Sequence, residues 1–370
     1  MCRIGVFILM FVTLLAGRAH AQTGSASAKE PLKGRFERGH FERIQVHGKS
    51  LEGNLAGDSP DRDVSVYLPP SYSTATARHY PVVYLLHGYT NSDEGWYGPA
   101  VKSGFESAKT TLPEAADRSV AAVGEHAARE MILVMPNAYS VYQGSMYSNS
   151  VTTGDWEAYI TRDLVAYIDA HYRTIPERAS RGLAGHSMGG YGTIRIAMKY
   201  PEVFSSIYIQ SGCCLTANLN PRAENLAKAE AIHSPADLAN ADRGLMTTFA
   251  EAAAWSPNPQ NPPFFFDLPV KDGKIQQAVV ARWAANAPLA MIDQYVPNLK
   301  KLHAIAIEVG DKDGLAASNK ELSLILTGYG IANTFETYDG DHTNRIALRV
   351  ETKLLPFFSE KLVFAPAPGK

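Results

Sequence analysis

The chain has 370 residues, of which 45% are hydrophobic and 10% aromatic, and its formal net charge at pH 7 is −2. This composition can bury a large core, and α/β folds of this length often form one domain, so a disordered chain is excluded. The near-neutral charge, without a lysine- or arginine-rich block, argues against nucleic acid as a partner.

The first residues have the three parts of a secretory signal peptide. Arg3 is basic, an apolar stretch follows from Ile4 to Ala16, and Ala19-His20-Ala21 supplies the small residues of a cleavage site. That stretch is about a dozen residues, short of the roughly 20 that a membrane span needs, and no later segment is apolar enough. We expect cleavage after residue 21 and a secreted or periplasmic mature protein without a membrane span.

Strands and helices are expected to alternate through most of the remaining chain. Residues 22–40 are rich in Ser, Ala, Gly and Lys and predict a mobile leader, so residues 41–370 are expected to form a single domain. Apolar and alternating runs predict one strand directly before Ser187 and others at 41–46, 63–68, 80–87, 131–135, 205–210, 303–309 and 334–338. Helical spacing predicts one helix directly after Ser187 and others at 156–172, 316–327 and 344–359. The first two strands indicate an antiparallel edge, and the alternation predicts a doubly wound, mostly parallel α/β sheet.

The segment 215–295 departs from this alternation and is predicted to be an insertion. It contains the proline-rich run 257–263, which three phenylalanines follow, and it separates two core strands. Such an insertion serves either as a lid or substrate wall, or as an excursion that shields the sheet. The sequence leaves both interpretations open.

Only two cysteines, Cys213 and Cys214, remain once the signal peptide has been removed. Adjacent cysteines cannot close a long loop. Two free buried thiols are expected, and a strained vicinal disulfide is the alternative.

A Gly-x-Ser-x-Gly pattern at residues 185–189 lies between an apolar strand and a helical segment. In so sharp a strand-to-helix turn the apical residue has strained backbone geometry, and flanking glycines are needed because a side chain there would collide with a neighbouring element. An isolated match can be a simple glycine-rich loop. These flanks instead predict that Ser187 is a nucleophile, exposed at the carboxyl end of the sheet.

A serine hydroxyl needs a base within hydrogen-bond reach and a third group that orients the base. Asp313 follows one predicted strand and His342 follows the next, which gives the order Ser, Asp, His of α/β-hydrolases. We therefore predict Ser187 as nucleophile, His342 as general base and acid, and Asp313 as the orienting carboxylate. The rivals are Asp311 for the carboxylate and, for the base, three other histidines, at positions 87, 186 and 303.

The oxyanion that forms from an attacked ester needs N–H donors about 3 Å away. The Met188 N–H, first in the helix after Ser187, is one candidate. The second is the Tyr89 N–H in the loop after an early core strand, where Gly88 allows the chain to approach closely. The alternative for His87-Gly88 is an ordinary turn at a strand end.

Four side chains are candidates for substrate binding: Trp96, Tyr147, Trp156 and His186. The aromatic residues lie in the loop after the strand at 80–87 or around the segment that leads into the 156–172 helix. They could form a wall for a phenolic acyl group or a sugar. They could equally be core residues beneath surface loops.

Several of these motifs together resemble the esterase D, or putative esterase, family. They are the run 87–96, the helix 161–174, the segments 185–190 and 200–204, and Gly310-Asp-Lys-Asp313. The family includes feruloyl and acetyl-xylan esterases, S-formylglutathione hydrolase and the antigen 85 mycolyltransferases, and the resemblance covers about residues 60–360. It implies an α/β-hydrolase without cofactor or metal, and it supports Ser187, Asp313 and His342. The long insertion departs from the compact members, so substrate identity does not carry over.

These features together predict a secreted serine esterase that works through an acyl-enzyme. Its substrates are expected to be small or polysaccharide-linked esters, such as feruloyl or acetyl esters of plant polysaccharide. An acyltransferase of the antigen 85 type is one alternative, and a non-catalytic binding module with the hydrolase fold is the other.

Overall fold

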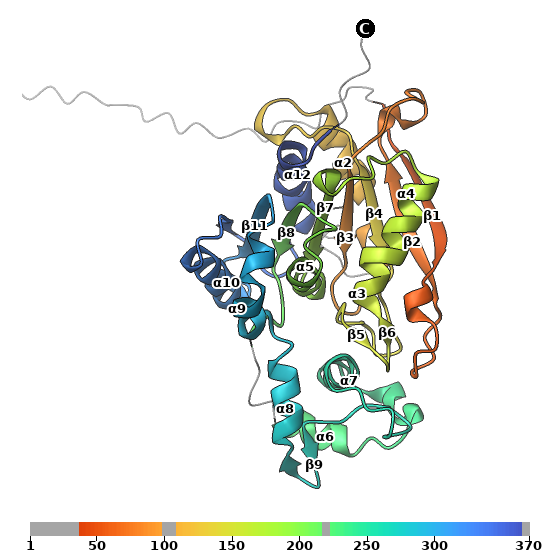
Figure 1. Cartoon of the computed structure of the whole chain (residues 1–370), viewed down its shortest axis with the longest axis vertical. Helices are drawn as coiled ribbons and strands as arrows, with labels where there is room; N and C mark the ends of the chain where they lie inside the picture. The colour runs from red at the N-terminus through yellow and green to blue at the C-terminus, as the bar shows by residue number, and fades with distance from the viewer. Residues whose placement is uncertain (1–36, 98–108, 217–222, 365–370) are drawn as a thin grey trace, which may run out of the picture. The chain divides into compact units, whose positions relative to one another are not determined.

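The computed structural model describes residues 37–97, 109–216 and 223–364 (Figure 1). The predicted signal peptide at 1–21 and most of the predicted leader at 22–40 lie outside the described residues. Within the described ranges, no helix has the length and apolar character needed to cross a membrane.

The central feature is one eight-stranded sheet with the strand order β1-β2-β4-β3-β7-β8-β11-β12. Its strands are β1 His40–His47, β2 Asp61–Leu68, β3 Val82–Leu86, β4 Ile132–Pro136, β7 Arg181–His186, β8 Ser206–Gln210, β11 Ala304–Gly310 and β12 Thr334–Tyr338. The first two strands pair antiparallel with each other, and β2 also pairs antiparallel with β4. All the other pairs are parallel. The predicted doubly wound sheet with an antiparallel edge is confirmed.

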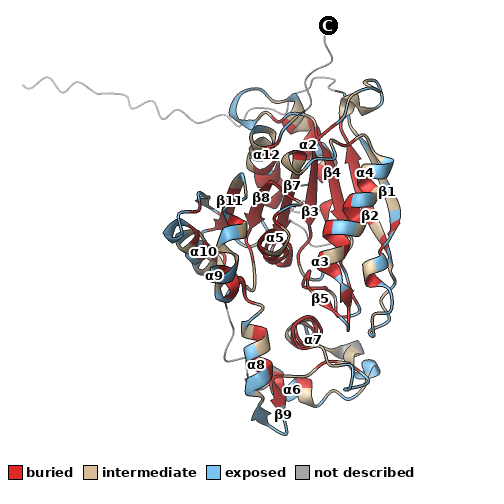
Figure 2. Cartoon of the chain, in the orientation of Figure 1, coloured by how far each residue is buried: buried red, intermediate tan, exposed pale blue. Residues whose placement is uncertain are grey.

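Helices cover both faces of this sheet. On one face lie α5 (Met188–Lys199), α9 (Pro288–Leu299), α10 (Ala316–Gly328) and the helix made of α3 (Trp156–Ala158), a π-helical stretch Tyr159–Leu164 and α4 (Val165–His171). On the other face lie α2 (Leu112–Ala121) and a C-terminal helix, which consists of α11 (Ile346–Arg349), the π-helical stretch Val350–Leu354 and α12 (Leu355–Lys361). The inner strands are therefore buried on both faces, as their continuous apolar runs require (Figure 2).

The segment between β8 and β11 holds α6 (Ala223–Glu230), α7 (Arg243–Trp255), α8 (Gln277–Ala284) and a short hairpin of β9 (Val270–Lys271) and β10 (Lys274–Ile275). These elements lie beyond β5 (Asn149–Ser150) and β6 (Gly154–Asp155) in Figure 1. The Ser150 hydroxyl donates to the Ala253 carbonyl, which ties α7 to β5. The predicted insertion boundary at residue 295 is too late, because it falls inside α9, and α9 packs against α5 as a helix of the sheet layer.

Candidate active site

The sharp turn between β7 and α5 places Ser187 at the carboxyl edge of the sheet. Ser187 has φ 58° and ψ −115°, a backbone conformation that residues with a side chain rarely adopt. A Cβ on Gly189 would lie 1.9 Å from the Leu86 carbonyl oxygen, and one on Gly185 would lie 2.3 Å from the Gly189 backbone. Both glycines are therefore required by the close approach of α5 to β3 and β7.

The structure brings Ser187, His342 and Asp313 together from three separate turns. Since β8, β11 and β12 run parallel, the turns after β11 and β12 reach the same edge as Ser187. The Ser187 Oγ lies 2.9 Å from His342 Nε2, and His342 Nδ1 lies 2.8 Å from Asp313 Oδ2. The His342 side chain is 33% exposed, so its Nε2 can exchange a proton with a molecule bound at the serine, whereas Asp313 is buried.

Asp313 is held as a carboxylate in this arrangement. Burial opposes its ionisation, but the hydrogen bonds from His342 and from the Leu315 N–H outweigh burial and lower its pKa. A carboxylate at this position fixes the proton of His342 on Nδ1 and leaves Nε2 free to accept the serine proton.

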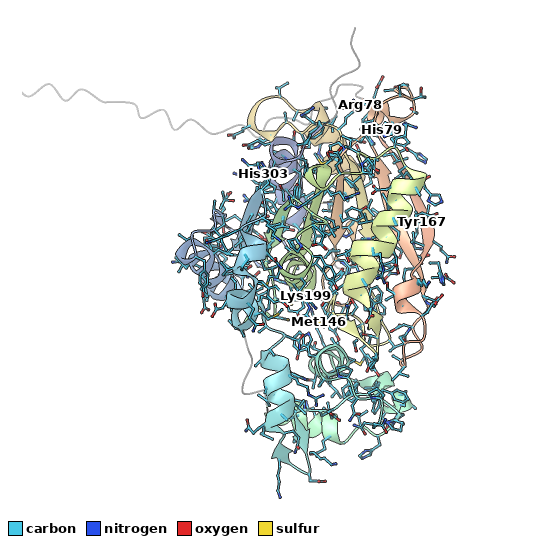
Figure 3. All side chains as sticks on the ribbon, viewed as in Figure 1. Arg78, His79, Met146, Tyr167, Lys199 and His303 are labelled. Carbon is cyan, nitrogen blue, oxygen red and sulfur yellow. The ribbon has the colours of Figure 1, made fainter. Side chains whose placement is uncertain are left out.

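The rival groups are engaged elsewhere. The Asp311 carboxylate accepts the Gly340 N–H at 3.0 Å and does not contact His342. His303 precedes β11 and lies at the end of the sheet marked by Arg78 and His79, far from Met146 at the other end (Figure 3). His87 is buried as a neutral imidazole: its Nδ1–H donates to the Gly88 carbonyl, its Nε2 accepts the Ala138 N–H, and burial lowers its pKa to about 4.

His186 has a role that differs from the predicted substrate contact. Its Nε2–H donates to the backbone carbonyl of His342 at 2.7 Å, and the two rings lie 4.7 Å apart. Burial, together with repulsion from a protonated His342, lowers the pKa of His186 to about 3. A neutral His186 therefore holds the loop that carries His342.

The two expected oxyanion donors lie on either side of Ser187. Met188 begins α5, and a Cβ on Gly88 would lie 3.3 Å from the Ser187 Cβ, so the loop that carries Tyr89 touches the nucleophile. In the described part of the chain, neither the Met188 N–H nor the Tyr89 N–H donates a hydrogen bond. Both donors are thus available to an oxyanion.

The aromatic residues predicted to bind substrate lie in the core. Trp96 is buried on the face of the sheet that α2 and the C-terminal helix cover, among residues of those two helices. Trp156 is fully buried and its indole N–H donates to the Thr153 carbonyl, and Tyr147 is fully buried with its hydroxyl on the His87 carbonyl. These side chains fill the core beneath the surface loops, so the prediction that they form a substrate wall is wrong.

A small cavity that the sequence did not indicate lies mostly within the insertion, near the nucleophile turn. Its volume is about 50 Å³, and six residues line it: Cys214, Thr216, Glu251, Trp255, Trp283 and Ala287. The signal that could have located it is the single acidic residue in the apolar helix α7. Cys213 and Cys214 are free thiols and are half-buried. Among the described residues, no group of His, Cys, Asp and Glu side chains could hold a metal ion.

Comparison with known proteins identifies the family to which this chain belongs. Residues 59–345 match the model of the family described as "Putative esterase". The chain belongs to this family.

The similar proteins are esterases and related hydrolases. An esterase of Mycobacterium tuberculosis is 31% identical over 150 residues, which are 40% of this chain and 28% of that protein. Mouse S-formylglutathione hydrolase is 26% identical over 40% of this chain and 51% of its own length. The matched regions thus span between about a quarter and a half of these relatives. Among solved structures, a ferulic acid esterase superposes with a TM-score of 0.60 at 21% identity, covering 88% of this chain and all of that one.

Proposed function

We propose that this protein is a serine hydrolase that cleaves carboxylic esters through an acyl-enzyme on Ser187. One observation carries this proposal: the continuous hydrogen-bonded chain from Ser187 Oγ through His342 to the buried carboxylate of Asp313. Membership of the esterase family, and the relatives named as esterases and hydrolases, support the ester as substrate.

The reaction follows from the positions of these groups. The Ser187 Oγ attacks the ester carbonyl while His342 Nε2 takes its proton, and Asp313 stabilises the imidazolium that forms. The oxyanion receives hydrogen bonds from the Met188 and Tyr89 N–H groups. His342 then gives the proton to the leaving alcohol, and a water activated by the same histidine releases the acid from Ser187.

The finer proposal is an exported enzyme that acts on feruloyl or acetyl esters of plant polysaccharide. The signal-peptide pattern at residues 1–21 supports export. The likeness to a solved ferulic acid esterase supports an aromatic acyl group.

The decisive variant is Ser187→Ala. We expect hydrolysis of p-nitrophenyl acetate and methyl ferulate to fall about 10⁴- to 10⁶-fold, because the acyl-enzyme cannot form. A fluorophosphonate probe should label the wild-type protein and not the variant. Ser73→Ala, which changes an exposed serine far along the chain from the turn, should leave both readouts unchanged. Undiminished hydrolysis by Ser187→Ala would refute the mechanism.

A further inference from the structure

The small cavity in the insertion lies close to the turn that carries Ser187. The Cys213 N–H donates to the Ser187 carbonyl at 3.1 Å, and the next residue, Cys214, lines the cavity. On the other side, the Trp255 ring lies 5.7 Å from the ring of Tyr191, whose own N–H also donates to the Ser187 carbonyl. The cavity therefore lies near the turn that carries Ser187, between the first turn of α5 and the insertion helices α7 and α8.

Helix α7 presents one accessible stripe to this region. From Gly244 to its end at Trp255, every residue of the helix is buried except Gly244, Thr247 and Glu251, which follow one another at steps of three and four. Residues at these steps share one face of a helix. Burial raises the pKa of the Tyr89 phenol, a hydrogen bond with Thr247 lowers it, and the negative charge of Glu251 raises it. Thr247 and Glu251 therefore lie near Tyr89, and Glu251 also lines the cavity.

Glu251 is half-buried and differs from the fully buried glutamates of the protein in having no partner among the described residues. Glu157 is paired with Arg195 and Lys199, and Glu308 is paired with Arg349. Within the described ranges, no side chain or backbone N–H donates to Glu251 and no cation pairs with it. Burial alone raises its pKa to about 7. A half-buried carboxyl group without a partner in the described part of the protein thus lines a space that a ligand can enter.

We propose that Glu251 is a specificity-determining residue that binds a hydroxyl group on the acyl portion of the ester. The inference rests on the proposed esterase function. The cavity suits the acyl portion because that portion stays on Ser187 through both steps, whereas the alcohol must leave to solvent after the first. The hydroxylated end of the acyl group enters the cavity between the two tryptophans, and the Glu251 carboxyl hydrogen-bonds its hydroxyl in either protonation state.

An ester without that hydroxyl is selected against. Its apolar end would displace water from Glu251 and leave the carboxyl without any hydrogen bond, which costs more than the hydrogen bond itself contributes. An acyl group that ends in a carboxylate is excluded by repulsion once Glu251 is ionised.

The test compares methyl 4-hydroxycinnamate with methyl cinnamate, two esters that differ by one hydroxyl. The wild-type kcat/KM should favour the hydroxylated ester by about tenfold or more, the effect of one buried hydrogen bond. Glu251→Leu should bring the ratio close to one, and Glu251→Gln, which keeps the shape and the hydrogen bonding, should keep most of the preference. Glu202→Leu, at an exposed glutamate, is the matched control and should keep the wild-type ratio.

A pH series adds a readout that a structural role of Glu251 would not change. In the wild type the preference should rise from pH 6 to pH 8 as the carboxyl ionises and becomes a stronger acceptor. In Glu251→Gln it should stay constant with pH.

Hydrolysis of p-nitrophenyl acetate separates the proposed function from the role of Glu251, because an acetyl group has no hydroxyl that Glu251 could bind. Failure of the wild type to hydrolyse any of the three esters would overturn the proposed function. If all proteins hydrolyse p-nitrophenyl acetate equally, but the wild type shows no preference or Glu251→Leu keeps it, the role of Glu251 alone is overturned.

Discussion

The side chains around Ser187 differ in whether they can carry charge. Asp313 is ionised because His342 and a backbone N–H donate to it, although burial opposes its charge. His186, at a similar depth and without a carboxylate, stays neutral and serves as a hydrogen-bond donor to the loop of His342. Of the two histidines, only His342 combines a carboxylate on Nδ1 with an accessible Nε2. Proton transfer is therefore assigned by contacts and burial rather than by residue type.

At the residue scale, the two neighbouring aspartates make a matched pair of variants. Asp313→Asn should lower kcat for p-nitrophenyl acetate on the order of 10⁴-fold, since an amide favours the wrong tautomer of His342. Asp311→Asn should change kcat little, because that carboxylate accepts only the Gly340 N–H. Steady-state kinetics of both purified variants checks the assignment, and equal losses in the two would contradict it.

At the element scale, the turn from β7 to α5 joins fold and function. The helix begins directly at the nucleophile, so the Met188 N–H is free at the same point where Ser187 takes its strained conformation. This geometry requires α5 to approach β3 so closely that the Leu86 carbonyl occupies the space of a Cβ on Gly189. Packing of the helix against the sheet therefore maintains the backbone strain at the serine.

The glycines of this turn provide a test of that packing. Gly189→Ala should reduce the free energy of unfolding by about 1–3 kcal/mol or more, since its methyl group would overlap a backbone oxygen that cannot move aside. The same variant should lose most esterase activity, because α5 and Ser187 shift together. Gly314→Ala, beside Asp313 but with no atom within 4 Å of the new Cβ, should be close to wild type in urea unfolding and in activity. Wild-type stability of Gly189→Ala would count against the close approach.

At the scale of the whole molecule, the parallel strands bring the residues of the site to one edge of the sheet. The turns after β3, β7, β8, β11 and β12 meet at one edge of the sheet, which brings together residues 155 positions apart in the chain. Two clusters of apolar side chains, one on each face of the sheet, stabilise the rest of the fold. Buried groups that can ionise make its free energy of unfolding depend on pH.

His87 makes the fold sensitive to acid. Its pKa is about 4 in the folded protein and near 6.5 when unfolded, so between these values the unfolded state binds the extra proton. Stability should thus fall as pH falls from 6.5 to 4, by up to about 1.4 kcal/mol per pH unit from this group. Urea unfolding of wild type and His87→Gln at pH 7 and 5 should show a smaller loss in the variant. His40→Gln, at an exposed histidine, should behave as wild type, and an equal loss in His87→Gln would rule out this origin.

Much of this arrangement was predictable from local signals. The apolar runs at residues 82–86 and 132–136 are strands because both their faces are covered, and the glycine pattern at 185–189 specifies the turn. The order of Ser187, Asp313 and His342 predicted which turns should meet, and the structure places these side chains in contact. Each of these signals lies within a few consecutive residues, where steric and hydrophobic patterning acts directly.

The features that only the tertiary structure reveals are those that depend on packing between distant segments of the chain. The sequence alone determined the α/β architecture and the candidate nucleophile, base and acid. It did not distinguish an aromatic residue that lines a cavity from one that fills the core, so Trp96 and Trp156 were misassigned, while Trp255 and Glu251 went unnoticed. The physical reason is that burial of a side chain depends on which elements cover it. In the insertion, the neighbours of Trp255 are Trp283, 28 residues away along the chain, and Tyr191, 64 residues away.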